Sequence, residues 1–81
     1  MPEYLNDENA HSSVLEAMAQ LGVPYASCSS GFFERNRKFG IAIIVQGQEY
    51  TTSIRVNGRV PTREQIDFGA RELGEMTGAL R

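Results

Sequence analysis

The chain has 81 residues, of which 41% are hydrophobic and 22% are charged, and its formal net charge at pH 7 is −2. This composition fits one small globular domain and excludes a wholly disordered chain, while the net charge gives no global attraction to nucleic acid. A single cysteine excludes an internal disulfide, and no apolar run has the length of a membrane-spanning helix. We therefore expect an intracellular protein, cytoplasmic or nuclear, with no membrane partner, in which a polar segment of residues 1–11 precedes one domain of residues 12–81.

The charges are distributed unevenly along the chain. Residues 1–30 carry four acidic residues and no lysine or arginine, whereas residues 31–63 carry six basic residues against two acidic ones. Residues 64–81 are acidic again, with four acidic residues against two arginines. A positive field confined to one surface steers an anionic ligand even when the total charge is negative.

The first predicted element is a helix that begins at Ser12 or Ser13 and ends at Gly22. Ser13 is a favourable N-cap, and Glu16 three residues later completes a capping box. Gly22 is followed by Pro24, as expected beyond a helix that ends in a left-handed residue. Apolar residues recur between these ends at helical spacing, at Val14, Leu15, Met18 and Leu21.

A weak strand is predicted over residues 24–30, with Ala26 and Cys28 on one face. Gly31 is predicted to end it, which places Phe32 and Phe33 in a loop. Two adjacent aromatic residues in a loop can contact a partner. We expect at least one of them to fold under the loop onto the core instead.

A hairpin of two stronger strands is predicted to follow. In residues 39–45 one face carries Phe39, Ile41, Ile43 and Val45 and the other Gly40, Ala42 and Ile44. In residues 50–56 one face carries Tyr50, Thr52, Ile54 and Val56 and the other Thr51, Ser53 and Arg55. Gly47 supplies the positive φ of a tight turn between them. Ile44 points to the opposite face from Ile43, so it is predicted to lie on the face of the sheet that no helix covers.

A last helix is predicted to begin after Thr62, whose hydroxyl is a good N-cap, and to end at Gly78. Its predicted apolar stripe consists of Ile66, Phe68 or Gly69, Ala70, Leu73 and Met76. The order helix, strand, strand, strand, helix predicts an α+β fold, in which two helices pack on one face of a three-stranded antiparallel sheet.

Three segments carry a resemblance to a known family. They are "VLEAMAQLGVPYASCSSG", "RKFGIAIIVQGQEY" and "PTREQIDFGARELGEM". Their order and spacing resemble the double-stranded-RNA-binding domain, with its α-β-β-β-α fold, over about Ser13 to Leu80. The resemblance implies recognition of RNA by shape, over about 16 base pairs and two successive minor grooves.

The resemblance implies three contact regions. The first is the exposed face of the first helix, matching Glu16 and Gln20, and the second is the loop at residues 31–36. The third is a lysine cluster at the start of the last helix, with the family pattern Ser-Lys-Lys-x-Ala-Lys. Here the sequence departs, because Glu64 and Asp67 stand at two of the three lysine positions. The family's Gly-Pro-x-His loop also reads "GFFE" in this chain. Weaker RNA binding is therefore expected, with Arg55, Arg59 and Arg63 partly replacing the missing lysines.

The sequence is compatible with two functions. The first is a non-catalytic module that contacts the backbone of double-stranded RNA, and its candidate residues are Glu16, Gln20, Arg35, Asn36, Arg37, Lys38, Arg59 and Arg63. The alternative is a degenerate domain of the same fold that binds a protein partner or a second copy of itself, with little or no RNA binding. Its candidate residues are Phe32, Phe33, Ile44, Tyr50 and Ile54.

Enzymatic chemistry and metal binding are not expected. His11 stands beside Ser12 and Ser13, which are interpreted as capping residues rather than as a catalytic pair. Cys28 is interpreted as a small core residue. With one histidine and one cysteine, the chain has neither a metal-ligand pattern nor a set of nucleophile, base and orienting residue, and no cofactor is implied.

Overall fold

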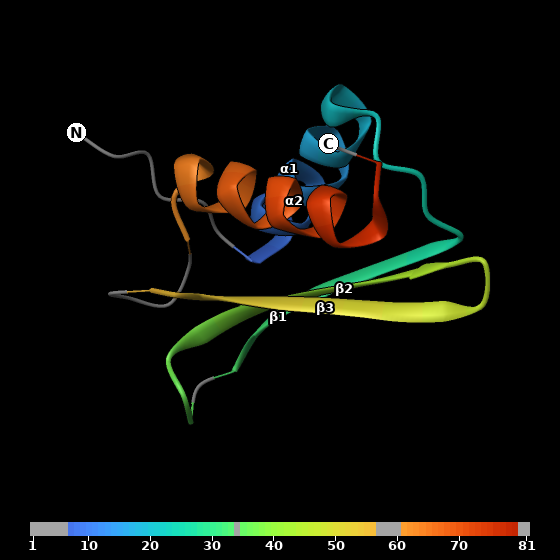
Figure 1. The fold of residues 1–81 in the computed structure, drawn as a ribbon. Coiled ribbons are helices and arrows are strands. Elements are labelled where there is room, and N and C mark those ends of the chain that lie inside the picture. Colours follow the sequence, from blue (N-terminus) through green and yellow to red (C-terminus); the bar gives the residue numbers. More distant parts are fainter. Residues whose placement is uncertain (1–6, 34, 57–60, 80–81) are drawn as a thin grey trace.

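A computed structural model describes residues 7–33, 35–56 and 61–79 of the chain. Two helices and three strands follow one another in the order α1, β1, β2, β3, α2 (Figure 1). Their bounds are Asp7–Leu21 for α1, Ser27–Phe33 for β1, Lys38–Val45 for β2, Gln48–Arg55 for β3 and Arg63–Thr77 for α2. The predicted α+β class and the predicted order of elements are confirmed.

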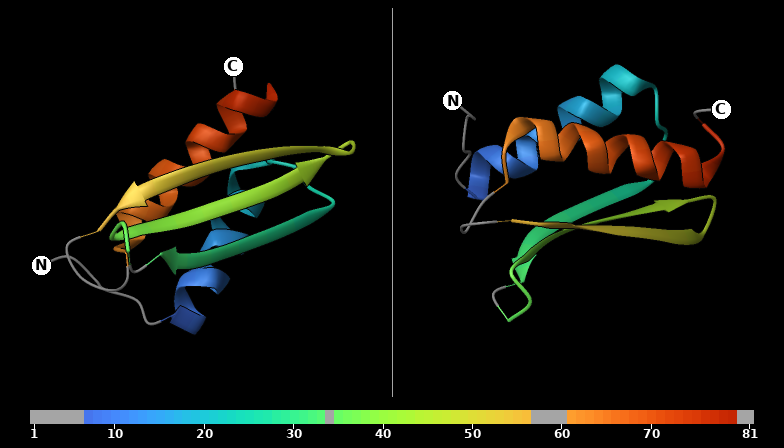
Figure 2. Two further views of the ribbon diagram at one scale, coloured as in Figure 1. Left: turned by 90° about the horizontal axis from the view of Figure 1, so that it is seen from below. Right: turned by 60° about the vertical axis from the view of Figure 1, so that its left-hand side comes forward.

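The strands form one antiparallel sheet with β2 in the centre. Both helices lie against the same face of this sheet, and its other face is uncovered (Figures 1 and 2). The register is continuous across the sheet, so the β2 residues from Lys38 to Ile44 have partners on both sides, and Val45 pairs with Gln48 of β3. Two edge strands and one open face are therefore the surfaces that this architecture exposes.

The core lies between the sheet and the helices, and β2 supplies its centre. Phe39, Ile41 and Ile43 are each at most 2% exposed, as their alternation in the sequence predicts. The helices contribute the facing layer, with fully buried residues at Val14, Met18, Ile66, Ala70 and Leu73. Burial of these side chains is the main favourable term for a domain of this size.

The first helix begins at Asp7, upstream of the predicted start at Ser12 or Ser13. Ser13 is buried inside the helix, so the predicted capping box is wrong. Ala10 explains the earlier start, because it is fully buried and adds one more turn to the face that packs on the core.

The first strand runs through Gly31, where it was predicted to end. Phe32 pairs with Phe39 and Phe33 pairs with Lys38, so both aromatic residues belong to the strand and not to a loop. The ladder with β2 supplies these backbone hydrogen bonds, which the sequence of β1 alone does not reveal. Phe32 is half-buried and packs against the core, whereas Phe33 is exposed.

The predicted cap of the last helix is confirmed. The Thr62 hydroxyl accepts a hydrogen bond from the backbone N–H of Gln65, and the Gln65 side chain accepts one from the backbone N–H of Thr62. The helix ends at Gly78, which has the predicted left-handed conformation with φ of 81°. Of the two alternatives in the predicted stripe, Gly69 is buried and Phe68 is 65% exposed, and the stripe is wrong at Met76, which is 44% exposed.

Gly69 takes the buried position in place of Phe68 and allows α2 to lie close to the sheet. A Cβ atom at Gly69 would stand 2.8 Å from Ile54 Cδ1 and 3.1 Å from Ile41 Cδ1. Both distances are shorter than ordinary contacts between carbon atoms. The separation between this helix and the sheet is therefore matched to a residue without a side chain.

Replacement of Gly69 by valine tests this close packing. We expect Gly69→Val to lower the free energy of unfolding by about 1–3 kcal/mol, because the added methyl groups overpack the contact with Ile54 and Ile41. Urea denaturation followed by circular dichroism measures the change. Ala19→Val on the exposed face of α1 is the control and should cost less than about 1 kcal/mol. Equal costs for both variants would contradict the close approach.

Candidate nucleic-acid interface

One end of the domain brings three separate segments together. The backbone N–H of Val56 donates to the carbonyl of Arg37 at 3.1 Å, which ties the end of β3 to the turn between β1 and β2. The Gln65 side-chain amide donates to the carbonyl of Arg55 at 3.1 Å, which ties the start of α2 to the same strand end. These two hydrogen bonds hold the turn, the end of β3 and the start of α2 together at this end of the molecule, which forms one backbone frame.

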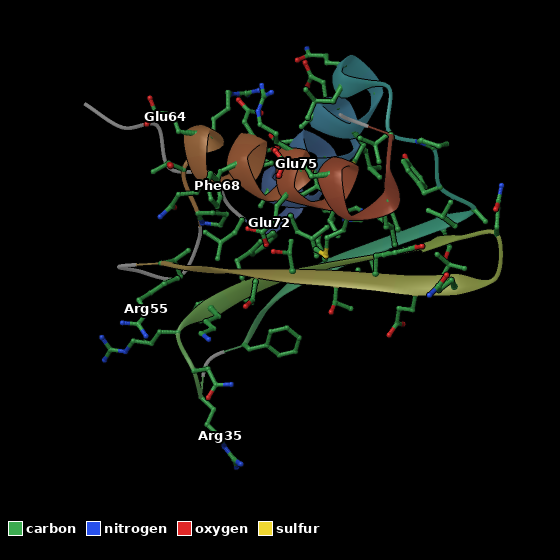
Figure 3. The ribbon with its side chains drawn as sticks, in the orientation of Figure 1. Arg35, Arg55, Glu64, Phe68, Glu72 and Glu75 are labelled. Atoms are coloured by element: carbon green, nitrogen blue, oxygen red, sulfur yellow. The ribbon has the colours of Figure 1, made fainter. Side chains whose placement is uncertain are left out.

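Four basic residues gather on this frame, and we call them the basic corner: Arg35, Arg37, Lys38 and Arg55. Lys38 and Arg55 are direct partners in the ladder between β2 and β3. Arg35, Asn36, Arg37 and Arg55 line a hollow of about 330 Å³. Figure 3 shows Arg35 and Arg55 extending away from the helices at this end of the sheet.

The electrostatics of the basic corner favour an anion. Like charges directly opposite each other on a sheet repel, and Lys38 stands opposite Arg55. In the part of the chain that the structure describes, none of the four cations forms a salt bridge. An anion such as a phosphate would therefore relieve a repulsion that no salt bridge among the described residues offsets.

The two candidate residues on the first helix lie on another surface. Glu16 and Gln20 are exposed, and the Gln20 amide donates to Glu16 Oε1 at 3.5 Å. Gln20 lines a small hollow between the helices together with Asp67 and Arg71 of α2. The structure thus brings the first predicted contact region beside the third one, and the basic corner supplies the second.

The start of α2 has mixed charge. Glu64 and Asp67 are exposed there with Arg63 and Arg71. The Thr62 hydroxyl already accepts from the backbone of the first turn, so the helix end is capped by the protein itself. A phosphate at this position meets acidic side chains. The candidate Arg59 lies outside the described residues.

The candidate residues for protein contact separate into two groups. Phe33 and Ile44 are exposed on the open face of the sheet, at 59% and 37%. Phe32 and Tyr50 are half-buried and pack against the core. Ile54 is 8% exposed and belongs to the core, so it is withdrawn from the set of exposed contact residues. Its alternation with Arg55 in β3 assigns it to the face that the helices cover.

Arg55 is predicted from the sequence only as a partial replacement for the missing lysines near the last helix, and the structure places it in the basic corner with the turn between β1 and β2. The signal that places it is the hairpin register, because a two-residue turn at Gln46 and Gly47 makes Val45 the partner of Gln48. Counting outward along the two strands from that pair brings Lys38 opposite Arg55. The prediction started the third strand at Tyr50 and did not fix this register.

The described residues contain no group of three His, Cys, Asp or Glu side chains that could hold a metal ion. His11 Nδ1 instead lies 2.6 Å from Ser30 Oγ, a hydrogen bond that joins α1 to β1.

Within the residues that the structure describes, no helix is both long enough and apolar enough to cross a membrane.

Comparisons of this chain with protein-family models, with curated proteins and with solved structures found no match. Function must therefore be argued from the site itself, since a fold alone does not determine it.

Cys28 faces the helices and packs against the core. Burial raises the pKa of its thiol above the ordinary value, so little reactive thiolate exists at neutral pH. A nucleophilic role for this residue is disfavoured by both effects.

We expect Cys28 in the folded protein to react slowly with iodoacetamide, with a rate that rises only at a higher pH than for an ordinary cysteine. The same chain unfolded in guanidinium chloride is the control, because its thiol has lost the burial that raises the pKa. Mass spectrometry over a range of pH measures both rates. Equal rates at neutral pH would contradict the burial of this thiol.

Proposed function

We propose that this domain is a non-catalytic module that binds double-stranded RNA by its backbone. The observation that carries the proposal is the basic corner, where Arg35, Arg37 and Lys38 of one segment meet Arg55 at the end of β3. Guanidinium groups bind phosphate oxygens through two parallel hydrogen bonds, and ammonium groups bind them as point charges. The α-β-β-β-α order and the resemblance of the three sequence segments support the choice of duplex RNA.

The expected affinity is modest and depends on salt. Each phosphate contact contributes about one unit to the slope of log affinity against log salt, so four cations give a slope of about −4. Glu64 and Asp67 oppose binding at the start of α2, where Asp67 lines the small hollow that also contains Gln20. The basic corner would then bear most of the interaction, with the face of α1 close to the duplex.

A second candidate function is contact with another protein. Phe68 and Met76 are exposed on α2, and Glu72, which lies between them in the sequence, accepts a hydrogen bond from the hydroxyl of Thr52 on β3. Figure 3 shows Phe68 and Glu72 on this helix. These side chains flank an edge strand whose outer backbone groups have no partner strand among the described residues. Strand addition at such an edge is a common mode of protein recognition, and charged edge residues oppose it.

Removal of one cation from the basic corner tests the first function. We expect Arg55→Ala to weaken binding to a blunt RNA duplex and to lower the magnitude of the salt slope by about one unit. Arg55→Lys keeps the charge and should keep the slope. Fluorescence anisotropy at several ionic strengths measures both quantities. Absence of duplex binding at low salt, with a mass in sedimentation that doubles with concentration, would favour the second function.

Restoring positive charge at the start of α2 should strengthen duplex binding. We expect Glu64→Lys combined with Asp67→Lys to raise the affinity by at least about tenfold and to steepen the salt slope. The matched control is Glu49→Lys combined with Glu75→Lys, which changes the net charge equally at exposed positions elsewhere. An equal gain in both double variants would show that total charge alone is responsible. No gain in a folded Glu64/Asp67 variant would argue against the alignment of the last helix.

A further inference from the structure

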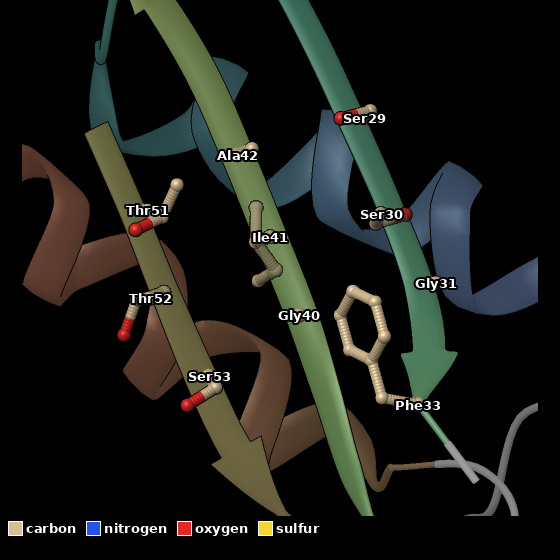
Figure 4. A pocket seen from close by; sticks show the side chains of 10 residues that line it. All are labelled: Ser29, Ser30, Gly31, Phe33, Gly40, Ile41, Ala42, Thr51, Thr52 and Ser53. Carbon is tan, nitrogen blue, oxygen red and sulfur yellow. The ribbon is translucent and has the colours of Figure 1, made fainter. Parts of the chain in front are cut away.

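The open face of the sheet contains a shallow groove whose floor is formed by small side chains. Two rows of the ladder cross it, one of Ser29, Ala42 and Thr51 and one of Gly31, Gly40 and Ser53. No side chain in these rows is larger than threonine. The resulting open-face groove has a volume of about 520 Å³ (Figure 4), which lies in the range of ligand sites.

Phe33 forms one wall of the open-face groove. A Cβ atom at Gly40 would stand 2.5 Å from Phe33 Cε2, so the ring occupies space that only a glycine leaves free. The side chain is nevertheless 59% exposed. Figure 4 shows the ring beside Gly40, with one of its faces turned toward the open side of the sheet. The strand thus presents an aromatic face that the protein itself does not cover.

Two cations stand in the same row of the sheet as this ring. Phe33 pairs with Lys38, and Lys38 pairs with Arg55, so the three residues are consecutive across β1, β2 and β3. Directly opposite residues on one face have Cβ atoms about 5 Å apart. An aromatic face, two cations and a row of hydroxyl groups are therefore all within reach of one ligand of nucleotide size.

We propose that the open-face groove binds an unpaired nucleotide of a single-stranded nucleic acid. The base stacks on Phe33, its polar edge meets the hydroxyl groups of the floor, and Lys38 or Arg55 holds the adjacent phosphate. Stacking on an aromatic side chain is tolerant of sequence because every base has a π face. The proposal shares Lys38 and Arg55 with the proposed duplex site and adds a ligand that the duplex site does not require.

The chemistry of this face favours nucleic acid over a second copy of the chain. Among its described residues, the apolar side chains are Phe33, Ala42 and Ile44, and the rest are polar, charged or glycine. Burial of so little apolar surface would contribute little free energy to binding a protein partner. Stable protein interfaces also bury at least about 1,000 Å² of surface in total. Two adjacent cations beside an aromatic ring instead match a phosphate joined to a base.

The test uses a short fluorescein-labelled oligouridylate and a blunt RNA duplex as separate probes. We expect Phe33→Ala to weaken oligouridylate binding by about five- to one-hundred-fold, the range that loss of one stacked base gives. Duplex affinity should stay unchanged, since the ring contacts no paired base. Phe68→Ala is the matched control, because it removes an equally exposed ring from α2 and should change neither affinity.

A second variant keeps the test independent of any loss of stability in Phe33→Ala. The chain has no tryptophan, so Phe33→Trp places its only indole in the groove. We expect this variant to keep the oligouridylate affinity and its fluorescence to be quenched on binding, because the base stacks on the indole. A tryptophan at position 68 in place of Phe68 should show no quenching.

The outcomes separate this proposal from the duplex proposal. Quenching at position 33 by oligouridylate without any binding of the duplex would support the groove site and overturn the duplex function. Duplex binding without quenching would overturn the groove site and leave the duplex function standing. A wild-type mass that doubles with concentration and returns to the monomer in Phe33→Ala, with no effect of oligouridylate, would assign the groove to a second copy and overturn the proposal.

Discussion

The structure depends on one packing interaction, the contact of the two helices with a single face of β2. Phe39, Ile41 and Ile43 are all buried in it, and Gly69 lets α2 approach close enough to cover them. A chain of 81 residues has few large apolar side chains, so one well-filled layer is what it can build. Residues on the other surfaces of the sheet consequently do not have to be large and apolar to form the core.

This division explains why the two candidate sites lie where they do. Residues that point away from the helices need not be large or apolar, and the open face accordingly carries glycine, alanine, serine and threonine in its middle rows. The described residues of the turn between β1 and β2, Arg35, Asn36 and Arg37, are likewise exposed and lie outside the core. Phe33 is the exception, a large ring on the open face that rests beside Gly40.

Acidic residues stand at the start of α2, where the resembled family has the lysines that contact RNA. Thr62 and Gln65 cap this helix end through two reciprocal hydrogen bonds, so the helix does not require lysines or an anion there. Positive charge is concentrated instead at the other side of the same end, where Lys38 faces Arg55 across the ladder. The proposed binding surface therefore lies on the sheet rather than at the start of the last helix, where the resemblance placed the lysine cluster. On the sheet it lies next to the open-face groove.

The sequence by itself determined the elements that local patterns specify: the alternation of β2, the turn at Gly47, the Thr62 cap and the Gly78 end. These signals are short-range, and each depends on residues within a few positions. The exposure of Arg35 and Arg37 was also predictable, since charged residues in a turn stay in solvent. Together they gave the order of elements and the α+β class.

Only the tertiary structure decided the features that depend on distant partners. The ladder with β2 extended β1 through Phe33, burial of Ala10 started α1 early, and the choice between Phe68 and Gly69 followed from the distance between helix and sheet. The basic corner and the open-face groove belong to the same class, because both join residues of different strands. The physical reason is that strand register and layer separation are set by packing across the whole domain, which no local pattern contains.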